Sequence, residues 1–216
     1  MSEDKDQGIY NFTAPVQSVF PNLIEARAVG PKGKEQGKPK YSLNFNFDPD
    51  SADLKNLKAL AAKVAKAKWP GRDLATLRFP FSNGDKLADK QKAKGKDAEF
   101  YRGKVVLVSR SQYEPRLSVI QNGGVTDLEG DARVAAKSKF YHGVEVLAQV
   151  NLVAYDGVGE DGKDGVTAYL NMVLSTNKGE KLSGGASAAE VFSGYAGIST
   201  TEDPTEGSDL DDEIPF

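Results

Sequence analysis

The sequence predicts a mainly β, α+β fold: an OB-fold-like barrel of five or six strands with one long helix, followed by a disordered acidic C-terminal tail. Three observations support this fold class. Strand-like patterns outnumber helical ones, the one long amphipathic helix follows the second strand, and the composition becomes a linker rich in Ser, Thr, Asp, Glu and Gly after about residue 197. We therefore expect a disordered N-terminus at 1–8, one domain at 9–198 and a flexible tail at 199–216.

The first two strands are predicted at 14–28 and 41–47. The first mixes apolar and polar residues and is expected to break near Pro21. The second alternates strictly, with Tyr41, Leu43, Phe45 and Phe47 on one face and polar residues on the other. Because Phe45 and Phe47 share their face with Leu43, we expect them in the core. Between the strands, residues 30–40 form a basic loop rich in Gly and Pro.

The clearest helix is predicted at 52–68. Asp50 or Ser51 can cap its N-terminus, and apolar residues recur at helical spacing from Leu54 to Ala65. Trp69-Pro-Gly ends it, and Trp69 is expected to pack under it. Residues 71–103 are polar and basic, which predicts a long loop with a functional role.

Strands dominate the rest of the domain. The β-branched and alternating runs predict strands at 104–109, 116–120, 143–155 and 166–175. The connections are expected to be a turn at 121–124, a short helical or irregular stretch at 129–139 and a hairpin loop at 156–165. A capping-box spacing at 187–190 predicts the start of one more short helix.

The composition argues against an enzyme. The chain has no Cys and one His, so it offers no thiolate nucleophile, disulfide framework or cluster of His ligands. No Walker, Gly-x-Ser-x-Gly or dinucleotide-binding motif occurs, and His142 is expected at the surface or in packing. We predict no metal and no cofactor, although a carboxylate-only Mg²⁺ nuclease site stays open as an alternative. With no long apolar run and no signal-peptide pattern, we expect a soluble cytoplasmic protein without membrane contact.

The charge is distributed unevenly along the chain. Residues 199–216 carry seven acidic side chains and no basic one, whereas the rest of the chain has 28 basic against 24 acidic residues, a net charge of +4. A mildly basic body can attract phosphate, and an acidic tail can compete for the same surface.

The tail ends in a short acidic and apolar motif. An acidic run is followed by an apolar tripeptide that carries the terminal carboxylate: Asp209, Asp211, Asp212, Glu213, Ile214, Pro215 and Phe216. A solubility tag gains nothing from a terminal Phe, so this pattern favours capture by a protein partner with an apolar pocket and a basic rim.

This tip resembles the C-terminal tip of bacterial and phage single-stranded DNA-binding proteins, nearly residue for residue. The stretches 140–174 and 179–190 are similar to the C-terminal half of the phage proteins of OB-fold type. The resemblance implies single-stranded DNA binding with little sequence specificity. It also implies recruitment of replication and recombination proteins through the tail, in the cytoplasm of a bacterial host. The body is longer and the linker shorter than in the bacterial tetrameric proteins, so the oligomeric state is not carried over.

Binding of single strands needs cations along the phosphates and aromatic rings on which bases stack. Residues 110–116 place a tyrosine between two arginines in a loop between strands, and the tyrosines at 155 and 169 fall on the polar faces of their strands. Phe140 and Tyr141 are open between a packing and a stacking role. The candidates for DNA contact are Lys40, Tyr41, Phe79, Phe81, Arg102, Lys104, Arg110, Tyr113, Arg116, Tyr155 and Tyr169.

The sequence therefore predicts a non-catalytic protein that coats and protects single-stranded DNA in replication, recombination or repair. Three alternatives stay open: an RNA-binding or annealing protein, a metal-dependent nuclease, and an adaptor whose tail alone has a partner. A reader of the RNA 2′-hydroxyl leaves no clear mark in a sequence of this kind.

Overall fold

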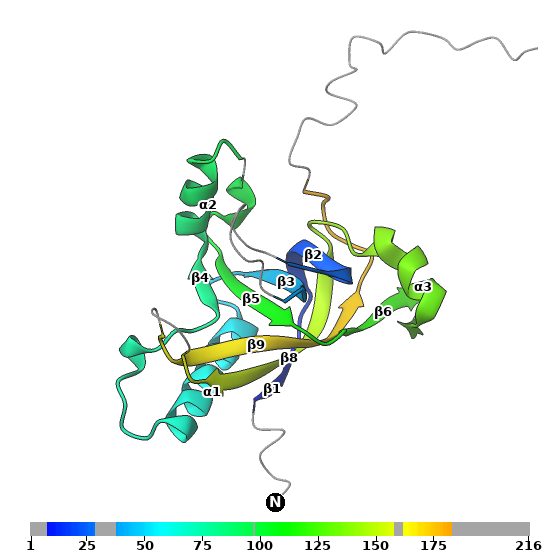
Figure 1. The fold of residues 1–216 in the computed structure, drawn as a ribbon. Helices are drawn as coiled ribbons and strands as arrows, with labels where there is room; N and C mark the ends of the chain where they lie inside the picture. Colours follow the sequence, from blue (N-terminus) through cyan, green and yellow to red (C-terminus); the bar gives the residue numbers. More distant parts are fainter. Residues whose placement is uncertain (1–7, 29–37, 97, 158–161, 183–216) are drawn as a thin grey trace, which may run out of the picture. The chain divides into compact units, whose positions relative to one another are not determined.

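The computed structural model describes residues 8–28, 38–96, 98–157 and 162–182 (Figure 1). Strands predominate, as predicted. They are β1 (Ile9–Asn11), β2 (Val16–Arg27), β3 (Lys40–Phe47), β4 (Phe81–Asn83), β5 (Val105–Ser111), β6 (Arg116–Gln121), β7 (Gly124–Leu128), β8 (Glu145–Tyr155) and β9 (Gly165–Ser175). The α-helices of the described residues are α1 (Ala52–Lys68), α2 (Gly84–Lys92) and α3 (Gly130–Ala135).

Five of the strands pair into a closed ring in the order β2, β3, β5, β9, β8. The pairing of β8 with β2 completes the ring. In chain order these are the first, second, third, fifth and fourth strands of the ring, and β5 and β9 run parallel. At that parallel contact the buried Ser109 hydroxyl donates a hydrogen bond to the Ala168 carbonyl oxygen at 3.1 Å. The predicted OB-fold-like arrangement is thus present as a five-stranded ring.

The remaining strands extend this sheet. β1 pairs with β8, β4 pairs with β5, and β6 pairs with β9 on one side and with β7 on the other. The described residues contain nine strands rather than five or six. Five of the six predicted strands form the ring, and the sixth, β6, lies beside it.

The ring encloses the main core. Leu43, Phe45 and Phe47 point inward from β3 and are at most 1% exposed, as their shared face predicted. Helix α1 packs against β8 and β9 (Figure 1) and contributes Leu54 and Leu57, which are fully buried. The predicted helix bounds are confirmed, and the Ser51 side chain caps the helix by accepting a hydrogen bond from the Leu54 amide.

A buried carboxylate ties the N-terminal strand to α1. Asp53 accepts hydrogen bonds from the Tyr10 hydroxyl, from the Thr13 hydroxyl and amide, and from the Ala14 amide at 2.7–3.2 Å. Burial raises the pKa of Asp53, but these hydrogen bonds together outweigh it and hold the pKa below its ordinary value. The ionised carboxylate is therefore the form that joins the two elements.

Residues 71–103 are not the long loop that the sequence predicted. They contain a 3₁₀ turn (Leu74–Thr76), β4, α2 and a second 3₁₀ turn (Glu99–Tyr101). Helix α2 is capped by the Asn83 side chain, which accepts a hydrogen bond from the Lys86 amide, and it buries only Gly84 and Ala88. With so small an apolar face, its sequence has no helical stripe to detect.

Two strands, β2 and β7, also differ from the prediction. β2 does not break at Pro21, because it continues past a bulge where its pairing with β3 shifts between Val19 and Asn22. The sequence also missed β7, because four of its five residues, Gly124 among them, are exposed, so it shows no alternation of buried and exposed positions. Within the described residues no helix is long and apolar enough to cross a membrane.

Candidate nucleic-acid interface

The outer face of the ring presents polar side chains on β3 and β5. Ser42 pairs with Arg110 and Asn44 pairs with Val108 in the antiparallel register, so each pair lies on one face. On the next strand, Ala168 points into the core, which turns its neighbours Thr167 and Tyr169 outward. The three strands therefore contribute one continuous outer surface.

A groove of about 500 Å³ lies on this surface, and we call it the Arg110 groove. It is bounded by the start of β3, the segment before β4, the end of β5, and the β8–β9 hairpin. Its lining residues are Lys40, Arg78, Phe79, Pro80, Val108, Arg110, Gln112, Tyr155, Val166, Thr167 and Tyr169. Five of the predicted DNA-contact residues meet here: Lys40, Phe79, Arg110, Tyr155 and Tyr169.

Arg78, which the sequence reasoning missed, is fixed at the groove by backbone pairing with the start of β9. Its amide donates to the Asp164 carbonyl at 3.0 Å, and its carbonyl accepts from the Val166 amide at 2.8 Å. Gly165 makes this approach possible, since a Cβ there would lie 2.4 Å from the Arg78 carbonyl oxygen. Isolated bridges of this kind leave no pattern in a sequence.

The Asp164 carboxylate anchors the base of the β8–β9 hairpin. It accepts a hydrogen bond from the Gly157 amide at 2.7 Å and pairs with Arg72. The Gly157 amide and the Arg72 guanidinium hold the pKa of Asp164 below its ordinary value. The hairpin that carries Tyr155 and Tyr169 is thereby joined to the segment that carries Arg78.

The groove has the charge and the rings that a single strand requires. Its described lining contains three cations, Lys40, Arg78 and Arg110, and no carboxylate. Tyr155 and Tyr169 expose 36% and 39% of their surface, so their rings are open to a ligand. This combination suits phosphates and unstacked bases together.

Two predicted residues face away from the groove. Tyr41 pairs with Ser111 and lies on the opposite face of β3 from Ser42, with the Arg133 guanidinium 6.0 Å from its ring centre. Phe81 pairs with Leu107, which points into the core, and Phe81 packs against that core. Neither ring is grouped with the groove residues.

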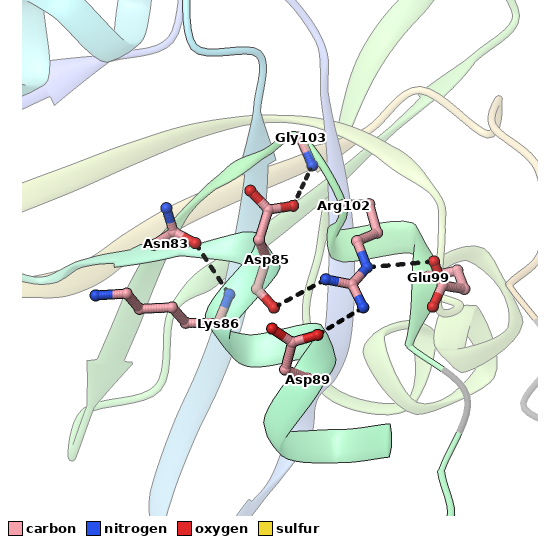
Figure 2. A network of polar contacts seen from close by, with 7 residues as sticks. All are labelled: Asn83, Asp85, Lys86, Asp89, Glu99, Arg102 and Gly103. Atoms are coloured by element: carbon pink, nitrogen blue, oxygen red, sulfur yellow. Dashed lines mark hydrogen bonds and ion pairs between the residues drawn. The ribbon is translucent and has the colours of Figure 1, made fainter. Parts of the chain in front are cut away.

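Arg102 and Lys104 are occupied by carboxylates outside the groove. Arg102 bonds Asp89 at 2.7 Å and Glu99 at 3.4 Å, which clamps α2 to the following 3₁₀ turn (Figure 2). The hydrogen bond with Asp89 is the largest cause of the raised pKa of Arg102, and burial opposes it. Lys104 pairs with Asp48. The structure gives both cations a structural partner and groups neither with the groove.

Tyr113 and Arg116 lie beside the groove rather than in it. Tyr113 is 82% exposed in the loop after β5, next to the groove residue Gln112. Arg116 begins β6 and is exposed.

The sequence left the roles of Phe140 and Tyr141 undecided between packing and stacking. Phe140 is buried and therefore packs, whereas Tyr141 is half-buried and its hydroxyl donates a hydrogen bond to the Gly179 carbonyl oxygen. The predicted tail residues 209–216, the helix at 187–190 and the boundary at 198 lie outside the described residues.

Within the described ranges no three His, Asp or Glu residues gather in a way that could hold a metal ion. A five-stranded ring whose outer face carries a cationic, tyrosine-lined groove has the features expected of a protein that binds single-stranded nucleic acid.

Comparison with known proteins identifies the family. A family model described as "Enterobacter phage Enc34, ssDNA-binding protein" matches residues 12–205, and the chain belongs to this family. A search of curated proteins finds no match. The family consists of binding proteins rather than enzymes, which confirms the predicted non-catalytic role.

Solved structures show the same fold. The single-stranded DNA-binding protein from bacteriophage Enc34 matches with a TM-score of 0.61 and 18% identity, over 84% of this chain and 88% of that chain. The same phage protein in complex with ssDNA matches with a TM-score of 0.60 and 19% identity, over 82% and 90% of the two chains.

Proposed function

We propose that this protein binds single-stranded DNA with little sequence specificity through the Arg110 groove. The observation that carries the proposal is the gathering of three cations and two exposed tyrosines on the outer face of the ring. Cations neutralise phosphates of any sequence, and every base has a face that stacks on an aromatic ring. Membership in a family of ssDNA-binding proteins supports the same conclusion.

The groove also suits an unpaired strand better than a duplex. Tyrosine rings that stack on bases need bases that have left the helical stack, and a duplex presents only its edges and phosphates. Binding of this kind covers the bases and protects the strand, which is the role we assign to the protein in replication, recombination or repair.

The test is titration of a labelled single-stranded DNA oligonucleotide in the presence of Mg²⁺, followed by fluorescence anisotropy and by gel analysis of the oligonucleotide. We expect saturable binding, an intact oligonucleotide, and weaker competition by RNA of the same sequence. Equal competition by RNA would favour the RNA-binding or annealing alternative, cleavage would favour the nuclease, and no binding would leave the adaptor.

The acidic tail recruits partner proteins in this proposal. Its support is the sequence: four acids at 209–213 precede Ile214, Pro215 and Phe216, in the manner of single-stranded DNA-binding proteins. A partner pocket takes the apolar tip and its basic rim holds the acids. The partners are replication and recombination proteins in the cytoplasm of a bacterial host. A Phe216→Ala variant should lose their binding while its affinity for DNA stays unchanged.

The tail also competes with DNA for the groove, since the body carries +4 and the tail −7. Deletion of residues 209–216 should then tighten DNA binding at low salt and have little effect at high salt, where screening already weakens the contact. Equal affinity of the full and truncated chains at low salt would contradict this competition.

A further inference from the structure

A second aromatic site lies on the outer face of the ring, beyond the Arg110 groove. Phe20, Phe100 and His142 form a cluster in which His142 stacks on Phe20 with ring centres 4.5 Å apart and an interplanar angle of 25°. Phe100 meets His142 edge-on at 4.8 Å. These rings line a cavity of about 530 Å³ together with Gln91, Gly95, Lys96 and Ala98, and we call it the Phe20 pocket.

The backbone holds Phe20 outward at a conformational cost. Its φ of 53° lies in the left-handed region, which a bulky side chain rarely adopts. The bulge of β2 creates this geometry, and the Phe20 side chain is 46% exposed as a result. A strained position that exposes a large ring points to a function for that ring.

His142 supports Phe20 as a neutral ring. Burial lowers its pKa, against a smaller opposing effect of its hydrogen bond with Leu182. In that bond Nδ1–H donates to the Leu182 carbonyl oxygen at 2.8 Å. Phe20 is therefore backed by a fixed aromatic ring and keeps an exposed surface on which a flat ligand can lie.

One lysine lines this pocket, and two more lie in the adjoining turn. Lys96 lines it, and Lys92 and Lys94 are exposed in the same turn. Backbone hydrogen bonds from the amides of residues 94–96 to the carbonyls of Gln91 and Lys92, at 2.9–3.1 Å, close this turn. An aromatic pocket beside exposed lysines on a hydrogen-bonded turn has the two features that bind a nucleotide, a stacking platform and charges for the phosphate.

The outer face connects this pocket to the Arg110 groove. Ser42 pairs with Arg110 on one side and with Asn22 on the other, and the Asn22 side-chain Nδ2 donates a hydrogen bond to the Ser42 hydroxyl at 3.1 Å. Two strand spacings separate Arg110 from Asn22, about 10 Å. Roughly three nucleotides span this distance even when stacked at 3.4 Å each. Asn22 is two residues from Phe20, so a strand that leaves the groove over Ser42 reaches the pocket.

We propose that the Phe20 pocket is a second nucleobase-binding site, which takes a base of the same single strand that occupies the Arg110 groove. The proposal rests on the proposed function, because the groove fixes the strand from which the base comes. The chemical class of the ligand is an unstacked nucleobase, held by stacking on Phe20, with its phosphate near the turn at 91–96.

The test compares two lengths of single-stranded DNA, about 4 and about 16 nucleotides, which bracket the site size of one OB fold. The variant is Phe20→Asn, because Asn tolerates a positive φ and removes the ring. We expect its affinity for the long oligonucleotide to fall about tenfold, as for loss of one stacked base. Its affinity for the short one should change by less than about twofold, while Arg110→Gln weakens both. Thermal unfolding of each variant verifies that it is folded.

A second measurement uses the unaltered protein and so does not depend on the folding of a variant. Long oligonucleotides that carry one photoreactive 5-iododeoxyuridine at successive positions are crosslinked, and the attached peptides are identified by mass spectrometry. We expect crosslinks to Phe20, Phe100 or His142 from positions a few nucleotides away from those that crosslink to Tyr155 or Tyr169.

The outcomes separate this inference from the proposed function. Crosslinks confined to the groove, with the same long-oligonucleotide affinity in Phe20→Asn and in the unaltered protein, would overturn the second site and leave the groove standing. Tighter long-oligonucleotide binding by Phe20→Asn would also overturn it, because it would mean that residues 209–216 or a second copy covers Phe20. Failure of the unaltered protein to bind either oligonucleotide would instead refute the proposed function.

Discussion

Removal of the three groove cations should change the salt dependence of DNA binding by an amount that the structure sets. Lys40, Arg78 and Arg110 line the groove. Each phosphate contact on a single strand contributes about −0.7 to the slope of log affinity against log salt. The variant with all three replaced by Gln should therefore lose about 2 units of slope. Between about 50 and 200 mM salt, the unaltered protein should then lose roughly 20-fold more affinity than the variant.

The assay is fluorescence anisotropy of a labelled single-stranded oligonucleotide across a salt series. A matched control replaces Lys58, Lys63 and Lys66 by Gln. These side chains are exposed on α1 and do not line the groove, and their replacement removes the same amount of positive charge. The control should keep the original slope, apart from a small long-range effect. An unchanged slope in the groove variant, or an equal loss of slope in the control, would refute the assignment of phosphate contacts to the groove.

Further predictions concern the rings and the supports of the groove. Tyr155→Ala and Tyr169→Ala should each weaken single-strand binding by about 1–3 kcal/mol in anisotropy titrations, with little change in thermal stability because both side chains are more than a third exposed. Gly165→Ala should lower the free energy of unfolding by about 1–3 kcal/mol and weaken DNA binding, because the added Cβ meets the Arg78 carbonyl oxygen. Denaturation and anisotropy data that match those of the unaltered protein would contradict this role. Asp53→Asn should destabilise the fold by about 1–3 kcal/mol at pH 7 in chemical denaturation. Because the folded-state pKa of Asp53 is lowered, its contribution is full above the ordinary pKa near 4 and is lost as pH falls through the lowered value, so the variant should show a shallower loss of stability in acid.

The ring could be predicted because its strands carry strong local patterns. Strict alternation in β3 gives both the strand and its core face, and helical spacing gives α1. By contrast, α2 buries two small residues and four of the five residues of β7 are exposed, so their formation depends on contacts that no local pattern records. The strand at 14–28 was predicted to break near Pro21 because a bulge that tolerates proline has no sequence signal of its own.

The groove was predicted in part, for reasons that individual residues make clear. Tyr155 and Tyr169 were placed correctly on exposed faces because strand polarity reveals the face. The same rule places Tyr41 on the face of β3 that Leu43 turns toward the core. The alternation of β3 therefore does not support Tyr41 as a residue of the groove. Arg78 reaches the groove only through an isolated bridge to Gly165, which depends on the tertiary fold.

Phe20 and Arg102 show the same limit. Phe20 is exposed by a bulge in a strand that was expected to break at the next residue. Arg102 was named as a candidate for DNA contact, and its ion-pair partner Asp89 lies on a helix that the sequence did not predict (Figure 2). The face of a strand on which a side chain lies can be inferred from local alternation, but the ion-pair partner of a charged side chain cannot.

The most direct test of the account is competition between single-stranded and duplex DNA for the intact protein. A labelled single-stranded oligonucleotide is bound, and unlabelled single strand or duplex of the same length is added at moderate salt. The account predicts displacement by the single strand at a much lower concentration than by the duplex, because only unpaired bases can stack on Tyr155 and Tyr169. Equal displacement by both would mean that phosphate contacts alone hold DNA, and it would contradict the groove as a single-strand site.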